Sequence, residues 1–121
     1  MKKVLIVEDE AVIRDAFTLL LEANNYAVTA VANGLEALEA CERDTFSLIL
    51  LDLMMPQLDG IEFLELADLG RRSPETKVVV LSNLSIGPEV ARAKELGAVR
   101  HEVKSNLAPR EVIALVEDAL G

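Results

Sequence analysis

The sequence predicts an α/β fold in which helices cover both faces of a parallel β-sheet. Short unbroken apolar runs recur along the chain, amphipathic segments of helical length lie between them, and turn-forming residues separate the two. Continuous apolar runs of this length are typical of strands buried on both faces, as they are in parallel sheets. Regular alternation of strand and helix then places right-handed crossovers on both sides of the sheet.

The apolar runs predict five strands, and their composition indicates where each strand lies in the sheet. The runs at residues 4–7, 48–51 and 78–81 are entirely apolar, which favours central positions. Residues 26–31 and 99–103 are less uniformly apolar and fit edge strands. The predicted strands are therefore, in chain order, residues 4–7, 26–31, 48–51, 78–81 and 99–103.

The segments between the strands are predicted to be helices because apolar residues recur at helical spacing. The clearest apolar stripes are Ile13, Ala16, Phe17 and Leu20; Leu35, Leu38 and Cys41; and Val112, Leu115, Val116 and Ala119. Capping and helix-breaking residues stand at the expected boundaries, namely Asn33-Gly34, Asp59-Gly60, Gly87-Pro88, Gly97 and Pro109. The pattern amounts to five strand–helix repeats without a linker or a second domain.

Length and composition agree with one domain spanning residues 1–121. The chain has the usual size of a domain, and 51% hydrophobic residues suffice for a core. No apolar run approaches the roughly 18 residues of a membrane span, and residues 4–7 are too short for a signal peptide. With a single cysteine no internal disulfide can form, so a cytoplasmic location is expected. The net charge of −9 argues against binding of nucleic acid or a membrane surface by this domain alone.

Polar residues directly follow four of the predicted strands. These residues are Glu8 and Asp9, then Asp52, Ser82 and Lys104. Ligands of open parallel sheets bind beyond the carboxyl ends of the strands, so the five side chains are expected at one edge. Taken singly, each has an ordinary structural explanation, such as a helix cap or a turn.

Taken together, the three carboxylates predict a cation at this edge. A close pair of carboxylates repels by about 4 kcal/mol at an effective dielectric constant of about 20. Lys104 supplies one positive charge, and a divalent cation supplies two more. An oxygen-rich site that also keeps water molecules suits Mg²⁺. The alternative is that one carboxyl group stays protonated at neutral pH.

Several segments together give the sequence a resemblance to a known family. They are residues 4–10 (VLIVEDE), residues 50–60 (LLDLMMPQLDG), Val80-Leu81-Ser82, Leu96-Gly97-Ala98 and Val103-Lys104. In this order and spacing, over essentially the whole chain, they resemble the CheY-like receiver domain of bacterial response regulators. The resemblance implies a single-domain flavodoxin-like (βα)5 fold whose five-stranded parallel sheet has the order 2-1-3-4-5.

The resemblance also implies a function and a set of roles. Asp52 is implied to be the phosphoacceptor, Ser82 the switch hydroxyl and Lys104 a contact to the phosphoryl group. The implied ligands of Mg²⁺ are Glu8, Asp9, Asp52 and the backbone carbonyl of Met54. The donor is implied to be a sensor histidine kinase or a phosphotransfer protein, and a downstream partner is expected at the face from Ser82 to the last helix. Such a domain catalyses its own phosphotransfer and dephosphorylation but is a signalling receiver, not a metabolic enzyme.

Four positions depart from the commonest pattern of that family. Glu8 stands where Asp is most frequent, and Ser82 replaces the frequent Thr but keeps the hydroxyl. His101 occupies the position of a Tyr or Phe that swings inward, so it is either a switch residue or simply a half-exposed residue of an edge strand. Ser105 stands where Pro usually follows a cis bond, and a cis bond before Ser costs about 2.5–4 kcal/mol. Both a cis and a trans bond after Lys104 remain open at this point.

Three other functions compete with this interpretation. A haloacid-dehalogenase-type phosphatase places its nucleophile after the first strand, with a second Asp two residues further on. Here the candidate nucleophile, Asp52, follows the third strand, and the residue two positions further on is Met54. A flavodoxin needs a phosphate loop after the first strand, where Glu8-Asp9-Glu10 would repel the phosphate. An interaction module that is never phosphorylated would not need the acid, hydroxyl and lysine set.

Overall fold

Five parallel strands form one sheet in the order β2-β1-β3-β4-β5. The structure is a computed structural model and describes residues 1–55, 57–83 and 87–121. The strands are β1 (Lys3–Val7), β2 (Ala27–Val31), β3 (Leu48–Leu51), β4 (Lys77–Ser82) and β5 (Arg100–Val103). The predicted parallel sheet and its strand order are confirmed, and each strand lies within two residues of its predicted boundaries.

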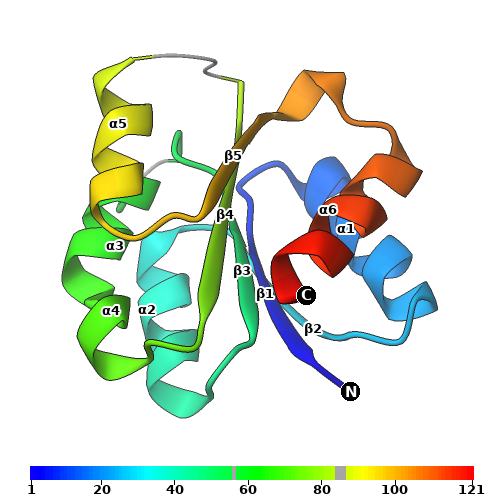
Figure 1. Cartoon of the computed structure of the whole chain (residues 1–121), viewed down its shortest axis with the longest axis horizontal. Coiled ribbons are helices and arrows are strands. Elements are labelled where there is room, and N and C mark those ends of the chain that lie inside the picture. The colour runs from blue at the N-terminus through cyan, green and yellow to red at the C-terminus, as the bar shows by residue number, and fades with distance from the viewer. Residues whose placement is uncertain (56, 84–86) are drawn as a thin grey trace.

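Helices cover both faces of this sheet (Figure 1). They are α1 (Ala11–Ala23), α2 (Gly34–Arg43), α3 (Gly60–Ala67), α4 (Leu69–Arg72), α5 (Pro88–Glu95) and α6 (Pro109–Leu120), with a short 3-10 helix η1 (Lys104–Asn106). Helices α1 and α6 lie on one face, and α2 to α5 lie on the other (Figure 1). Within the described part of the chain, no helix combines the length and the apolar character needed to cross a membrane.

The crossover between β3 and β4 contains two helices where the sequence predicts one. Asp68 ends α3 in the left-handed conformation, with φ of 47°, and the chain resumes as the short helix α4. Asp tolerates this conformation better than most residues, because its short side chain can bond to the local backbone. The break leaves the general architecture of alternating strands and helices unchanged.

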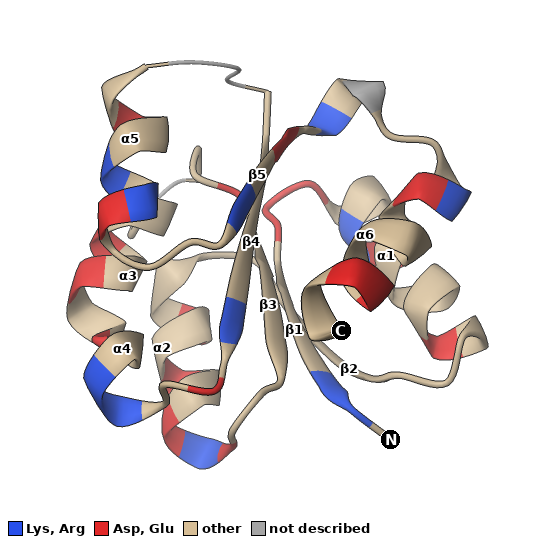
Figure 2. Ribbon diagram, viewed as in Figure 1, with Lys and Arg blue, Asp and Glu red and all other residues tan. Residues whose placement is uncertain are grey.

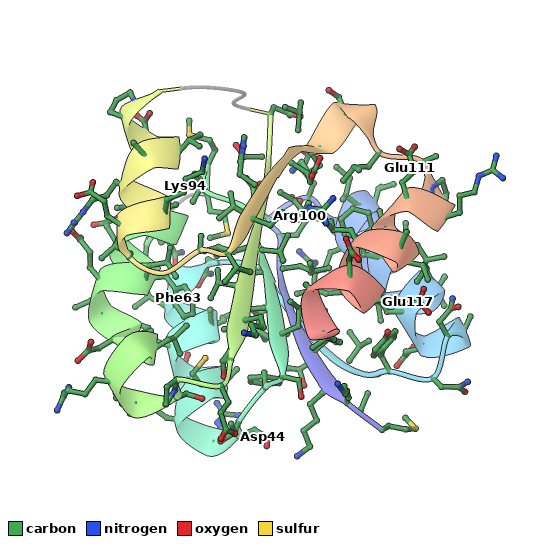
Figure 3. All side chains as sticks on the ribbon, viewed as in Figure 1. Asp44, Phe63, Lys94, Arg100, Glu111 and Glu117 are labelled. Carbon is green, nitrogen blue, oxygen red and sulfur yellow. The ribbon has the colours of Figure 1, made fainter. Side chains whose placement is uncertain are left out.

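The sheet separates two hydrophobic cores. On the face of α2 to α5, strand β1 contributes Leu5 and Val7, and Phe63 points from α3 toward the sheet (Figure 3). On the face of α1 and α6, the same strand contributes Val4 and Ile6. Successive side chains of a strand point to opposite faces, so both faces must be apolar when both are covered. This explains why the central strands have unbroken apolar sequences.

The predicted helix stripes are only partly correct. Helix α6 buries Val112, Leu115 and Val116, as predicted. In α2, however, Leu35 is 50% exposed and Ala37 is the buried residue, and in α1 Ala16 is exposed and Leu21 is buried. Phe17 of α1 and Leu38 and Cys41 of α2 still pack against the cores, so in these two helices the buried side overlaps the predicted stripe without coinciding with it. Tertiary packing sets the rotation of a helix about its axis, which the sequence pattern gives only approximately.

Candidate functional site

Hydrogen bonds that continue the sheet place two acidic residues side by side at its carboxyl edge. The N–H of Glu8, just after β1, donates to the carbonyl of Val31 at 3.0 Å. The N–H of Asp52, just after β3, donates to the carbonyl of Val7 at 3.1 Å. Since β1 and β3 are neighbours in the sheet, each acid extends its strand by one residue and ends beside the other.

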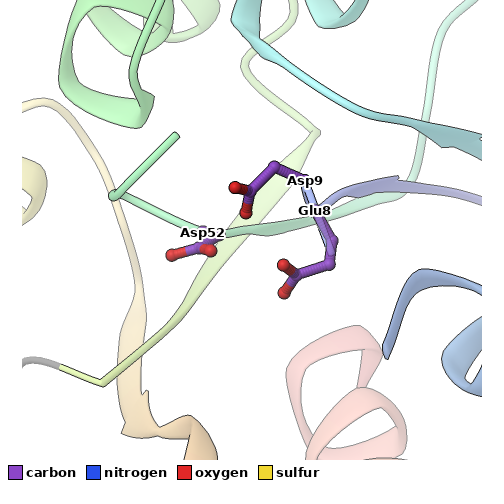
Figure 4. A group of neighbouring side chains, drawn as sticks. All are labelled: Glu8, Asp9 and Asp52. Carbon is purple, nitrogen blue, oxygen red and sulfur yellow. The ribbon is translucent and has the colours of Figure 1, made fainter. Parts of the chain in front are cut away.

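Glu8, Asp9 and Asp52 form a compact group of carboxylates (Figure 4). One oxygen from each side chain lies within 4.8 Å of the others. Glu8 and Asp52 retain only 3% and 5% of their exposed surface, whereas Asp9 is exposed. Three hard oxygen donors with one side open to solvent fit a divalent cation that keeps part of its water shell. The predicted convergence of these residues is therefore present in the structure.

Lys104 inserts its ammonium group between the two buried acids. The residue begins η1 directly after β5, and its peptide bond to Ser105 is trans. Its Nζ lies 2.7 Å from Oε1 of Glu8 and 3.1 Å from Oδ2 of Asp52, and its side chain is only 7% exposed. Figure 2 shows an acidic stretch directly after β1 and a basic residue directly after β5. The trans bond thus still allows the lysine to reach Asp52.

The electrostatics of this group follow from burial and from an excess of negative charge. Burial removes water from the Glu8 carboxylate and the charge of Asp52 repels it, so the pKa of Glu8 is raised despite its bond to Lys104. Burial alone would lower the pKa of Lys104, but the hydrogen bonds and charges of Glu8 and Asp52 outweigh it and raise the pKa. The lysine is therefore positively charged at neutral pH. Its single charge does not balance the three carboxylates, so a further cation would be attracted to the site.

Backbone donors hold the remaining oxygens of the buried acids. The N–H of Glu10 donates to Oε2 of Glu8 at 3.0 Å, and the N–H of Met54 donates to Oδ1 of Asp52 at 3.1 Å. Each buried carboxylate thus accepts from the lysine with one oxygen and from the backbone with the other. Within the described residues, no group donates a hydrogen bond to the carboxylate of Asp9.

Ser82 and His101 lie on the neighbouring strands β4 and β5. Ser82 is the last residue of β4, has no exposed surface and pairs in register with Val103, next to Lys104. His101 is half-buried, and its Nε2 is enclosed without a hydrogen-bond partner in the described part of the chain. Ser82 therefore ends the strand that neighbours β3, in register with the residue before Lys104, whereas a switching role for His101 stays a prediction.

Met54 lies at the solvent side of the site. Its side chain is 59% exposed. Together with Asp9, Leu53, Met55 and Asp59 it lines a surface pocket. The backbone of Met54 thus contacts Asp52 while its side chain borders the opening, and the predicted role of its carbonyl as a metal ligand stays a prediction.

Two further residues shape the site, and their roles are not evident from the sequence. Arg14 of α1 donates from Nη1 to the carbonyl of Glu8 at 2.8 Å and so holds the loop after β1. Gly60 begins α3, and its N–H donates to the carbonyl of Leu53 at 3.1 Å. Nothing in the spacing of Arg14 indicates this contact. For Gly60 the sequence predicts only a helix boundary at Asp59-Gly60.

Comparison with known proteins agrees with this geometry. A family model described as "Response regulator receiver domain" matches residues 4–117. The transcriptional regulatory protein ResD of Bacillus subtilis is 38% identical over 120 residues, which is 98% of this chain and 48% of ResD. The transcriptional regulatory protein SrrA of Staphylococcus aureus is 35% identical over 120 residues, 98% of this chain and 47% of SrrA. The chain thus spans about half the length of these curated relatives.

Solved structures show the same architecture. A CheY-like response regulator receiver domain protein from Methanospirillum hungatei has a TM-score of 0.91 at 28% identity, covering 99% of this chain and 94% of that one. The chemotaxis response regulator CheY4 of Vibrio cholerae has a TM-score of 0.89 at 27% identity, covering 98% of each chain. The matched family, the strand order and the acidic edge lead to one conclusion: the chain belongs to the response regulator receiver domain family of two-component systems.

Proposed function

We propose that residues 1–121 form a receiver domain that accepts a phosphoryl group on Asp52 from a sensor histidine kinase or a phosphotransfer protein in the cytoplasm. The observation that carries this proposal is the environment of Asp52. Its carboxylate is buried at the carboxyl edge, 3.1 Å from the ammonium of Lys104 and beside two further acids. A carboxylate held between a fixed cation and a candidate metal site is suited to attack a negatively charged phosphoryl group.

The transfer step is a displacement at phosphorus. A carboxylate oxygen of Asp52 forms a bond to the phosphorus while the bond from phosphorus to the donor imidazole nitrogen breaks. The electron pair of that broken bond stays on the imidazole nitrogen, and Asp52 becomes an acyl phosphate. Lys104 pairs with an oxygen of the arriving group, because its ammonium already contacts the acceptor. Later attack by water on the phosphorus releases inorganic phosphate and restores the Asp52 carboxylate.

The acidic group fits Mg²⁺ as the partner of this step. Glu8, Asp9 and Asp52, with the backbone carbonyl of Met54, would hold the ion. When bound, Mg²⁺ would neutralise part of the charge that builds up on the transferring oxygens. Asp9 is the most accessible of the three carboxylates, and we expect it to contact the ion directly. Both oxygens of Glu8 already accept bonds from the protein, which favours a contact through water.

The switch in this proposal is the hydroxyl of Ser82. Phosphorylation would introduce an oxygen acceptor that the resting site lacks, and the Ser82 hydroxyl would donate to it. A contact made in only one state biases two conformations, with His101 on the adjacent strand as the candidate reporter. We propose that the face from Ser82 to α6 then contacts a partner or output domain. Because the curated relatives are named transcriptional regulatory proteins, control of transcription is the first output to examine.

The acceptor assignment is tested by labelling with a small-molecule donor. Incubation with phosphoramidate and Mg²⁺ should add one phosphoryl group that is lost at alkaline pH, as measured by intact-protein mass spectrometry. Asp52→Asn should abolish the added mass, and the control Asp44→Asn, at the other edge of the sheet, should keep it. Labelling of Asp52→Asn at another residue would refute the assignment.

The switch assignment needs a separate measurement. Ser82→Ala should still accept the phosphoryl group but should lose the change in amide chemical shifts along β5 and α6 that phosphorylation causes in the parent. Ser47→Ala provides a matched hydroxyl deletion away from the site. If Ser82→Ala shows the full set of shifts, the hydroxyl does not couple phosphorylation to the partner face.

A further inference from the structure

The start of helix α2 touches the loop that follows β3 at a distance only glycine allows. Gly34 is the first residue of α2, and its N–H donates to the carbonyl oxygen of Leu58 at 2.9 Å. A Cβ atom on Gly34 would lie 2.4 Å from that oxygen and 2.9 Å from the Cβ of Leu58. Because the obstacle is backbone, a larger residue at position 34 would have to displace Leu58 itself.

A second close contact joins the same loop to the proposed acceptor. Gly60 follows Leu58 by two residues and begins α3. A Cβ atom on Gly60 would lie 2.6 Å from the carbonyl oxygen of Asp52 and 2.8 Å from the Cα of Leu53. The N–H of Gly60 also donates to the carbonyl of Leu53. The start of α3 therefore packs directly against the backbone of Asp52.

The segment between these two contacts is held firmly. Asp59 caps α3 by accepting from the N–H of Glu62 at 2.9 Å, and the Glu62 side chain accepts from the N–H of Asp59 at 3.1 Å. This reciprocal pair fixes the direction in which the chain enters the helix. A displacement at Leu58 is then passed on to Gly60, because packed backbone segments do not compress.

We propose that Gly34 is a positioning residue for the phosphoryl and metal site. Through Leu58 and Gly60, the start of α2 sets the position of the Asp52 backbone, and hence of its carboxylate relative to Lys104 and Glu8. This inference rests on the proposed role of Asp52. It adds a residue far along the chain from the acidic edge that no motif of the sequence connects with that edge.

The test compares three glycine-to-alanine variants. Gly34→Ala should raise the Mg²⁺ dissociation constant, measured by titration calorimetry, and should slow labelling by phosphoramidate. We expect each change to be roughly threefold to tenfold, because misplacing a reacting group by about 1 Å can lower a rate by up to about 100-fold. Gly60→Ala should have the larger effect because its methyl group meets Asp52 directly. Gly70→Ala is the matched control, since no atom lies within 4 Å of a Cβ there. The double variant Gly34→Ala/Gly60→Ala should show less than the sum of the two effects.

A purely structural role of Gly34 gives a different result. In that case Gly34→Ala would lower the melting temperature but leave the Mg²⁺ dissociation constant and the labelling rate of the folded protein unchanged, and the proposal would be wrong. Absence of labelling in the parent would instead refute the acceptor role of Asp52, while the Mg²⁺ constants would still report on Gly34.

A measurement on the parent keeps the proposal testable if Gly34→Ala does not fold. Coupling between two sites is reciprocal, so Mg²⁺ binding must stabilise the contact of Gly34 with Leu58. Mg²⁺ should therefore slow hydrogen exchange of the Gly34 amide several-fold. The amide of Asp44 at the other end of α2, which donates to Ala40, should change less. Equal exchange of the Gly34 amide with and without Mg²⁺ would overturn the proposal.

Discussion

Two lysines form ion pairs at opposite ends of the parallel strands. The distances in the two places are nearly the same, but the surroundings differ greatly. We call the side of the sheet where the strands begin its amino edge, and the side where they end its carboxyl edge. At the amino edge, Nζ of Lys3 lies 2.8 Å from Oδ1 of Asp44, and the two side chains are 51% and 41% exposed. Asp44 is labelled in Figure 3. At the carboxyl edge, Nζ of Lys104 lies 2.7 Å from Glu8 and 3.1 Å from Asp52, and all three side chains are nearly buried.

The contrast shows that distance alone does not identify a functional ion pair. At the amino edge one base meets one acid in water, and the hydrogen bond from Lys3 lowers the pKa of Asp44. At the carboxyl edge one base is shared by two acids, and burial raises the pKa of Glu8. Water screens the first pair, whereas the second retains an uncompensated negative charge in a site with little water. Burial and charge balance thus separate a surface contact from a site prepared for a cation.

The largest difference is expected when each lysine loses its charge. Lys104→Met leaves Glu8 and Asp52 buried beside each other, and we expect it to lower the free energy of unfolding at neutral pH without Mg²⁺ by about 3 kcal/mol. The matched variant Lys3→Met should cause a much smaller loss, because water takes the place of the ammonium. Urea denaturation of both variants measures the difference, and equal losses would mean that the two edges do not differ in this respect.

Removing an acid from the buried group should have the opposite sign. In metal-free protein, Asp52→Ala leaves Lys104 paired with Glu8 alone and relieves repulsion, so the free energy of unfolding should rise by about 1–2 kcal/mol. Mg²⁺ should then raise the melting temperature of the parent more than that of the variant, because the variant has lost a ligand. Equal Mg²⁺ effects on both proteins would show that the carboxylates do not share a metal site.

The two edges should also respond oppositely to pH. A carboxyl group with a raised pKa, such as Glu8, favours folding below the ordinary glutamate value of about 4.3, and this advantage is lost as pH rises through the raised pKa. A carboxyl group with a lowered pKa, such as Asp44, favours folding above about 3.9 and loses this as pH falls.

The two opposite pH dependences are tested with the parent, Glu8→Gln and Asp44→Asn, each kept free of metal by a chelator. From acid toward neutral pH, the stability of the parent relative to Glu8→Gln should fall. Across the acid range, the stability of the parent relative to Asp44→Asn should rise as pH increases. Thermal unfolding at a series of pH values measures both differences, and slopes of the same sign would contradict the assigned directions.

The sequence predicts the acidic edge well because the relevant information is local. A polar residue that directly follows a buried strand must lie at the edge of the core, so the position of Glu8, Asp52 and Ser82 in the sequence is enough to predict that they lie there. The sequence does not reveal that Lys104 lies closer to Glu8 than to Asp52, since this depends on the path of the chain after β5. The contact between Gly34 and Leu58 is equally hidden, because it joins backbone atoms of two distant segments.

The smallest expected effect concerns the lifetime of the proposed phosphorylated state. Hydrolysis requires a water molecule aligned behind the phosphorus, and the exposed residues Met54 and Asn83 follow Asp52 and Ser82 closely in sequence. Met54 lines the surface pocket beside Asp9, and its thioether side chain can cover the opening but cannot orient water. Asn83 is larger than Ala or Gly and is expected to narrow the same opening. We therefore expect the phosphoryl group to persist for many minutes.

Met54→Asn tests this expectation, because an amide at the same place can hold a water molecule by hydrogen bonds. We expect phosphate release, followed after removal of the donor, to accelerate a few-fold, which corresponds to less than about 1.4 kcal/mol in the barrier. Met54→Leu is the matched control, since it keeps an apolar cover of similar size and should leave the rate unchanged. A parent half-life of seconds, or equal rates for the parent and Met54→Asn, would show that Met54 does not limit access of water. Equal acceleration by both variants would instead indicate that the flexibility of the methionine chain, and not its apolar character, controls hydrolysis.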